Sequence, residues 1–216
     1  MGGGKLGACS GYNLLIMSAF PNLPDGYGLA RTIDLRKQPG LLLWLNLIGL
    51  VLLLLFAWLF FWLAARLHAP VGPGLSSTGD PPAAWVTVLA IVLAFVTILL
   101  LHELVHGAFF WLITRSRPRF GLQITYAYAA APDWYIPRNP YLVVGLAPLI
   151  LITLAGVALL PLLPDVWVLP WVLALALNAS GSVGDVYIIG WLLARPASVL
   201  VNDHGDSIHF YLPGSL

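Results

Sequence analysis

Four long apolar stretches constrain the fold of this 216-residue chain more than any other feature. They run from Leu41 to Ala65, from Ala83 to Thr114, from Tyr141 to Leu163 and from Val166 to Ala194. Each is longer than the about 20 residues that a helix needs to cross the hydrocarbon core of a bilayer. The sequence therefore predicts an all-α polytopic membrane protein with four transmembrane helices.

The composition excludes several other classes of protein. Only 9% of the residues are charged, whereas soluble domains usually carry about a quarter. Ten Lys and Arg against nine Asp and Glu leave a net charge of +1, so no basic surface for nucleic acid is expected. The single cysteine, Cys9, excludes a disulfide framework within the chain and a thiolate metal site. The expected partners are the lipid bilayer and a membrane protein or peptide.

The positions of Lys and Arg predict the orientation in the membrane. Nine of the ten lie in the N-terminal segment, in the loop between the second and third spans, or at the C-terminal tail, and Arg66 alone lies in the first loop. Basic loops stay on the cytoplasmic side. We therefore expect an integral protein of a prokaryotic plasma membrane with both termini cytoplasmic. The predicted segments are a cytoplasmic or interfacial lead-in (1–38), a membrane domain (39–195) and a cytoplasmic tail (196–216).

Three ionisable residues lie close together inside the second span. An ionisable side chain in a span costs roughly 2.5–3.5 kcal/mol on insertion scales, so each needs a reason. His102 and His106 are four residues apart and share a helix face, where both imidazoles can bind one metal ion. Glu103, the only Glu of the chain, completes the HExxH pattern of zinc hydrolases, in which it is the general base on a zinc-bound water. The alternative is a set of polar groups that hydrogen-bond to neighbouring helices.

The fourth span supplies a candidate for the third metal ligand. Asp185 lies ten residues before Arg195, and His106 lies nine before Arg115, so a rise of about 1.5 Å per residue places both at nearly the same depth. The alternatives are a hydrogen bond between helices or a pairing with Arg195. Asn178 lies two turns before Asp185 and could bind a substrate carbonyl or a developing oxyanion. It could equally join two helices.

The loop after the second span carries an alternating pattern. Large apolar side chains occupy every second position from Phe120 to Tyr128, which predicts a strand within 119–131 or a short cytoplasmic β-hairpin. Its edge could hold a substrate in extended form, or its aromatic side chains could simply lie at the level of the lipid headgroups. His204 and His209 lie in the tail, where a hairpin is a better interpretation than a metal site.

Three segments carry a resemblance to a known family. The HExxH helix, the motif Asn-x-x-Gly-Ser-x-Gly-Asp and the lead-in Leu-Pro-Asp-Gly-Tyr with Thr-Ile-Asp-Leu resemble the DUF3267 family over residues 23–212. The resemblance implies a multi-span membrane protein of zincin peptidase type. The layout is also similar to that of site-2 intramembrane proteases, where an Asp from a later helix completes the site, as Asp185 would here. The chain departs from that pattern because Val186 stands where a Gly is usual, and no Pro follows Asn178.

Together these observations predict a membrane-embedded zinc metallopeptidase that hydrolyses peptide bonds of membrane-associated substrates. The predicted ligands of Zn²⁺ are His102, His106 and Asp185, and the predicted catalytic residues are Glu103 and Asn178. The alternative is a non-catalytic metal-binding membrane scaffold or regulatory protein. A transporter is disfavoured, because it would distribute polar residues along several spans, whereas here they gather at one depth.

Overall fold

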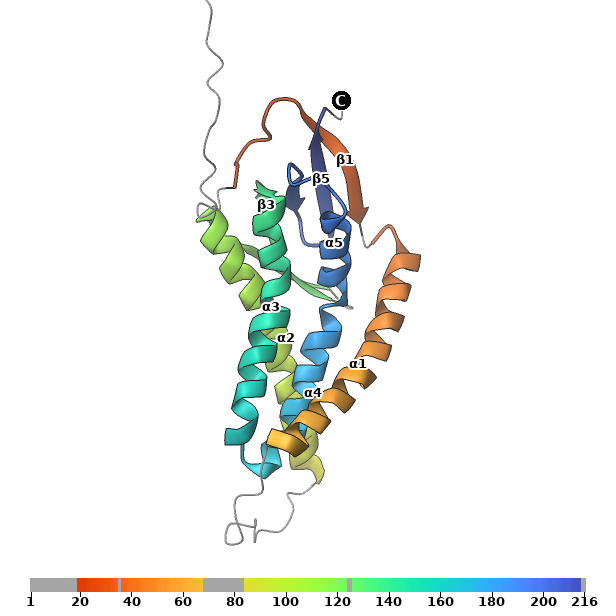
Figure 1. Cartoon of the computed structure of the whole chain (residues 1–216), viewed down its shortest axis with the longest axis vertical. Coiled ribbons are helices and arrows are strands. Elements are labelled where there is room, and N and C mark those ends of the chain that lie inside the picture. The colour runs from red at the N-terminus through yellow and green to blue at the C-terminus, as the bar shows by residue number, and fades with distance from the viewer. Residues whose placement is uncertain (1–18, 35, 68–83, 124–125, 215–216) are drawn as a thin grey trace, which may run out of the picture.

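The protein is a bundle of membrane-length helices with a β-sheet at one end, as a computed structural model shows (Figure 1). The structure describes residues 19–34, 36–67, 84–123 and 126–214. The helices are α1 (Pro39–Leu67), α2 (Ala84–Thr114), α3 (Arg138–Leu159) with the 3₁₀ turn η1 (Leu160–Leu162), α4 (Asp165–Gly181) and α5 (Val183–Leu193). They provide four helical segments long and apolar enough to cross a membrane, which confirms the four predicted spans. The first 18 residues of the predicted lead-in lie outside the described residues.

The last span is not one continuous helix. It is interrupted at Ser182, whose ψ angle of 2° departs from helical values. The Ser182 hydroxyl donates a hydrogen bond to the Asn178 carbonyl at 3.0 Å, a back-bond that bends helices. The interruption leaves Asp185 in the first turn of α5. Because of this interruption, the spacing of seven residues between Asn178 and Asp185 does not put their side chains on the same face of one helix.

The sheet corrects the all-α prediction. Its five antiparallel strands are β1 (Tyr27–Asp34), β2 (Arg119–Leu122), β3 (Ala127–Pro137), β4 (Leu200–Asp203) and β5 (Ser207–Pro213), in the order β1-β5-β4-β3-β2. The strands come from the lead-in, the central loop and the tail, and β1 pairs with β5 across most of the chain. Alternation within one short segment does not show such distant pairing, so the sequence-based prediction was wrong on this point.

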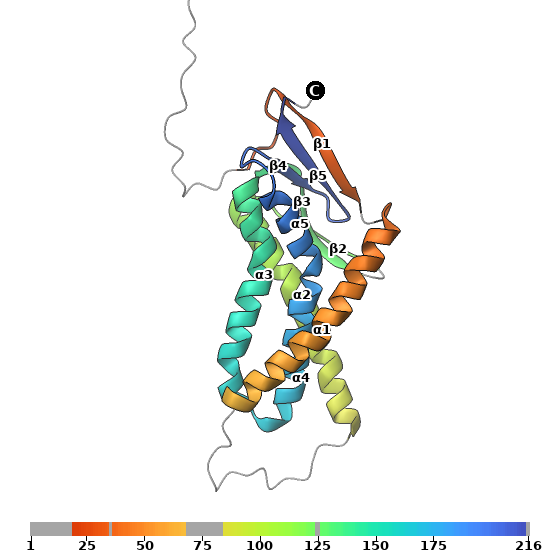
Figure 2. The same cartoon turned by 45° about the vertical axis from the view of Figure 1, so that its right-hand side comes forward.

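The predicted hairpin after the second span is confirmed. Strands β2 and β3 pair antiparallel, with Arg119 opposite Ala130 and Leu122 opposite Ala127. The alternating segment is not a single strand, because β2 ends at Leu122 and β3 begins at Ala127. Between them the Gln123 N–H donates to the Tyr126 carbonyl at 2.8 Å. Both strands lie against α2, beside the upper half of the bundle (Figure 2).

Two apolar clusters stabilise the two parts of the molecule. One joins the sheet to the adjoining helix ends and includes Ile136, Val144 and Phe210. The other lies inside the bundle around Val172 and Leu175 of α4, which contacts α1, α2 and α3. Many other large apolar side chains on the helices are exposed, as is expected of surfaces that face lipid. A cavity with polar side chains in its wall borders the first cluster, where Phe110 and Val144 belong to both.

A glycine in the β4–β5 turn allows the sheet to close over this region. Gly205 has a φ of +88°, and a Cβ there would overlap the ring of Tyr128. We expect Gly205→Ala to lower the melting temperature of the purified protein, since the left-handed backbone alone costs roughly 1–2 kcal/mol for an L residue. Gly190→Ala on α5 is the control, because a Cβ there meets nothing within 4 Å. Equal melting temperatures for both variants would contradict this role of the turn.

Candidate metal centre

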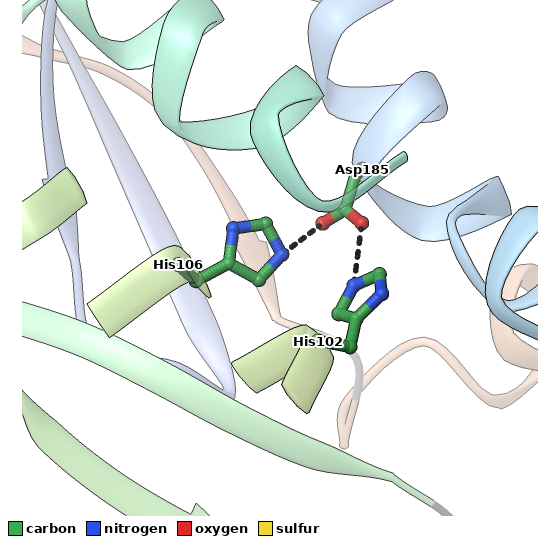
Figure 3. A group of neighbouring side chains, drawn as sticks. All are labelled: His102, His106 and Asp185. Atoms are coloured by element: carbon green, nitrogen blue, oxygen red, sulfur yellow. Dashed lines mark hydrogen bonds and ion pairs between the residues drawn. The ribbon is translucent and has the colours of Figure 1, made fainter. Parts of the chain in front are cut away.

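Two helices bring three potential metal ligands together. His102 and His106 extend from α2, and Asp185 extends from the start of α5 (Figure 3). The His102 Nε2 atom lies 3.3 Å from Asp185 Oδ2, and the His106 Nε2 atom lies 3.4 Å from Asp185 Oδ1. All three ligand atoms lie within 4.8 Å of one another, so the group could hold a metal ion.

The other ring nitrogen of each histidine faces an oxygen acceptor. His102 Nδ1 lies 3.0 Å from Asn178 Oδ1, and His106 Nδ1 lies 3.0 Å from the Val144 carbonyl. An amide or carbonyl oxygen only accepts, so each Nδ1 carries the hydrogen and donates it. In the neutral imidazole this leaves the Nε2 lone pair directed at the Asp185 carboxylate. A lone pair and a carboxylate oxygen repel each other, and a cation that lies between them removes this repulsion.

This arrangement fits zinc on chemical grounds. Zinc accepts imidazole nitrogen and carboxylate oxygen, and catalytic sites use three protein ligands with one open position. Histidine ligands typically donate their second N–H to an oxygen that fixes ring orientation. Both histidines of α2 meet this requirement. The acceptor for His102 is Asn178 of α4, and the acceptor for His106 is the Val144 carbonyl of α3.

The local sequence of α3 explains why the Val144 carbonyl is available. Pro148 lies inside this helix, four residues after Val144. Proline has no backbone N–H, so the carbonyl four residues earlier lacks its helical donor. The His106 Nδ1–H supplies that donor. Because of the proline, the Val144 carbonyl is available inside the apolar bundle to accept a hydrogen bond from His106.

Glu103 faces the same cavity as the three ligands. The cavity has a volume of about 200 Å³, and its wall includes His102, Glu103, His106 and Asp185. Glu103 lies against the backbone of β3 at Ala129. Its carboxylate therefore lies between the ligand helix and this strand, in a position to exchange a proton with a molecule in the cavity.

Asn178 lies behind the ligands and does not line the cavity. It is only 3% exposed, its Oδ1 faces His102, and its Nδ2 donates to the Pro148 carbonyl at 3.4 Å. Of the two interpretations that the sequence left open, this geometry is that of an amide joining helices α2, α3 and α4. His204 and His209 of the tail also lie away from the centre, with their rings 4.8 Å from each other.

Two residues of the cavity wall were not anticipated from the sequence. Tyr141 of α3 donates its hydroxyl hydrogen to Asp203 of β4, and both line the cavity. Asp203 is followed by His-Gly-Asp, a composition typical of a turn, which gave no indication of a buried group. Only the pairing of β4 with β3 and β5 brings it to the cavity.

Comparison with known proteins gives one match. A family model described as "Putative zincin peptidase" matches residues 85–200, more than half of the chain. No curated protein and no solved structure matches. The matched region contains the HExxH pattern on α2 and Asp185 on α5. The chain belongs to the DUF3267 family.

Proposed function

We propose that the protein is a membrane-embedded zinc metallopeptidase that hydrolyses peptide bonds of membrane-associated proteins or peptides. The observation that carries the proposal is the convergence of two Nε2 atoms and one carboxylate beside a cavity that Glu103 also lines. His102 and His106 supply imidazole nitrogen and Asp185 supplies carboxylate oxygen, the ligand types that zinc accepts.

Each residue has a distinct role in this proposal. His102, His106 and Asp185 hold the metal, while the Asn178 amide oxygen and the Val144 carbonyl fix the orientation of the rings. Zinc bound there would polarise the scissile carbonyl and acidify a water molecule. Glu103 accepts the proton of the attacking water and returns it to the nitrogen of the leaving amine.

The substrate segment is proposed to lie extended beside β3. Residues 127–129 of this strand line the cavity, as Glu103 does. Strand β2 is hydrogen-bonded to one edge of the same residues. A peptide bond inside a transmembrane helix is shielded by its helical hydrogen bonds, so the segment must unwind before hydrolysis. Main-chain pairing with a strand is one way to hold it in that form.

We further propose that the end of the bundle with the sheet faces the cytoplasm. Both ends of the described chain lie at this end (Figure 1). The basic residues at the helix ends there include Lys37, Arg115, Arg138 and Arg195, whereas Arg66 ends α1 at the opposite end. The cavity would then receive water from the cytoplasmic side.

The direct test is proteolysis by the purified, zinc-loaded full-length protein in lipid nanodiscs. The probe is a membrane-anchored peptide library, and the products are identified by mass spectrometry. Cleavage that depends on Glu103 and on zinc supports the proposal. Intact substrates at long incubation with a zinc-loaded protein would contradict it.

The orienting role of Asn178 makes a separate prediction. We expect Asn178→Ala to weaken zinc binding by roughly 10–100-fold, the usual cost of losing a group that orients a metal ligand. Competition with a chromophoric zinc chelator measures the change. The control is Ser180→Ala, since the buried Ser180 hydroxyl donates only to the Leu177 carbonyl on its own helix. An unchanged affinity in Asn178→Ala would refute the assigned role.

A further inference from the structure

A buried carboxylate lies at the sheet end of the cavity, apart from the metal ligands. Asp203 is 6% exposed and lines the cavity at the end of β4. Its Oδ2 accepts the Tyr141 hydroxyl hydrogen at 2.5 Å, and its Oδ1 accepts the Gly205 N–H at 2.7 Å. Tyr141 lies one helical turn before Val144, the residue that binds His106. The carboxylate is thus held by two hydrogen bonds in the wall of the cavity that the three metal ligands also line.

In the described part of the chain, no basic side chain of the cavity wall pairs with Asp203. Four carboxylates line it: Glu103, Asp185, Asp203 and Asp206. Glu103 and Asp185 would balance the two charges of a bound zinc ion, and Asp206 pairs with Arg36 at 3.0 Å. No Lys or Arg is among the described residues that line the cavity. Asp203 thus contributes one uncompensated negative charge.

Burial makes a negative charge on Asp203 costly. It raises the pKa of Asp203 to about 6, against the opposing effect of the hydrogen bonds from Tyr141 and Gly205. A positive charge placed beside the group would favour its ionised form. A buried charge is tolerated best when it is paired, so a cation entering the cavity gains a strong interaction.

A polar group without a hydrogen-bond partner among the described residues also lines the cavity. Tyr126 lines the cavity, and its hydroxyl is shielded from solvent without a hydrogen-bond partner in the described part of the chain. A hydroxyl oxygen can accept a hydrogen bond from an ammonium or guanidinium group. Two polar groups on this wall, one charged and one unpaired, therefore favour the same kind of ligand.

We propose that Asp203 forms a subsite that binds a positively charged group of the substrate next to the scissile bond. The group is a Lys or Arg side chain or a free amino terminus. Each of these is a cation that donates hydrogen bonds. This inference rests on the proposed peptidase function, because it assigns a specificity to the same cavity. It makes the enzyme selective for substrates with a positive charge near the cleaved bond.

The test measures peptide binding by Glu103→Gln protein loaded with zinc in nanodiscs, so that hydrolysis does not interfere. The probes are short fluorescent peptides that carry Lys or norleucine, or Arg or citrulline, at each position in turn, with a free or an acetylated amino terminus. We expect one positive group to tighten binding by roughly 10–30-fold, as for a desolvated charge pair. If acetylation weakens binding, the positive group is the amino terminus. If replacement of Lys by norleucine or of Arg by citrulline weakens binding, the positive group is that side chain.

The variants assign this preference to Asp203. In the double variant Glu103→Gln/Asp203→Asn, charged and neutral peptides should bind with about the same affinity. The affinity for neutral peptides should not change, which shows that the cavity is still folded. Asp203→Ser is a second neutral variant. Asp133→Asn is the matched control, because Asp133 is exposed and pairs with Arg119 outside the cavity. Equal binding of charged and neutral peptides, or a preference that survives loss of the Asp203 charge, would overturn the proposal. A charge preference without hydrolysis by the wild type would instead reject only the peptidase function.

Discussion

Replacement of Glu103 by Gln should abolish peptide hydrolysis and leave the metal in place. The amide keeps the size and polarity of the side chain, but it cannot accept the proton of the attacking water. General-base catalysis contributes about 10²–10⁴-fold to a rate, so the variant should lose at least that much of kcat. The assay follows cleavage of a membrane-anchored peptide by protein in nanodiscs, with zinc content measured on the same samples.

Asp133→Asn is the appropriate control for this experiment. It makes the same change from carboxylate to amide on β3, at a side chain that is 69% exposed and pairs with Arg119. We expect this variant to retain full activity. Equal activity of Glu103→Gln and wild type would exclude the proposed mechanism. It would favour the alternative of a metal-binding scaffold, for which Glu103 has no chemical task.

Replacement of His102 by Ala should remove the metal itself. The change deletes one of three ligands and leaves Asp185 and the Asn178 amide without their shared partner. Metal analysis of the purified protein should give about one zinc per chain for wild type and nearly none for the variant. Added zinc should raise the melting temperature of wild type only, because a ligand that binds the folded state stabilises it.

The tail provides the control for metal loss. His209→Ala removes a histidine that pairs across the sheet with Asn202 and contacts the His204 ring, away from the centre. This variant should keep wild-type zinc content. Stoichiometric zinc in His102→Ala, or no bound metal in wild-type protein, would reject the assignment of the centre.

The spans and the proximity of the ligands could be predicted from sequence because both depend on local periodicity. Four apolar stretches predict four helices, and four-residue spacing puts His102 and His106 on one face of α2. Counting residues from the ends of the spans predicted that Asp185 lies at the same depth. That count does not cross the interruption at Ser182, because Asp185 and Arg195 both lie after it in the chain.

The sheet and the surroundings of the ligands depend on long-range contacts that no local pattern shows. Strand β1 finds its partner β5 about 180 residues later, and Asp203 reaches the cavity only through the strands on both sides of β4. For Asn178 the sequence left two roles open, a contact with the substrate and a link between helices. Its contact with His102 joins α4 to α2 and could not be read from the spacing along one span.

The proline of α3 has a consequence for how such metal centres are inherited. Pro148 has no side-chain group that can bind a metal, yet its missing N–H leaves the Val144 carbonyl available to His106. Selection for a firmly held histidine on α2 therefore also acts on an apolar residue of α3, about 40 positions away. In a diverging lineage, a change at one of these two positions alters what the other can become. Helix α2, which carries the HExxH pattern, and helix α3, which carries the proline, are then expected to evolve together.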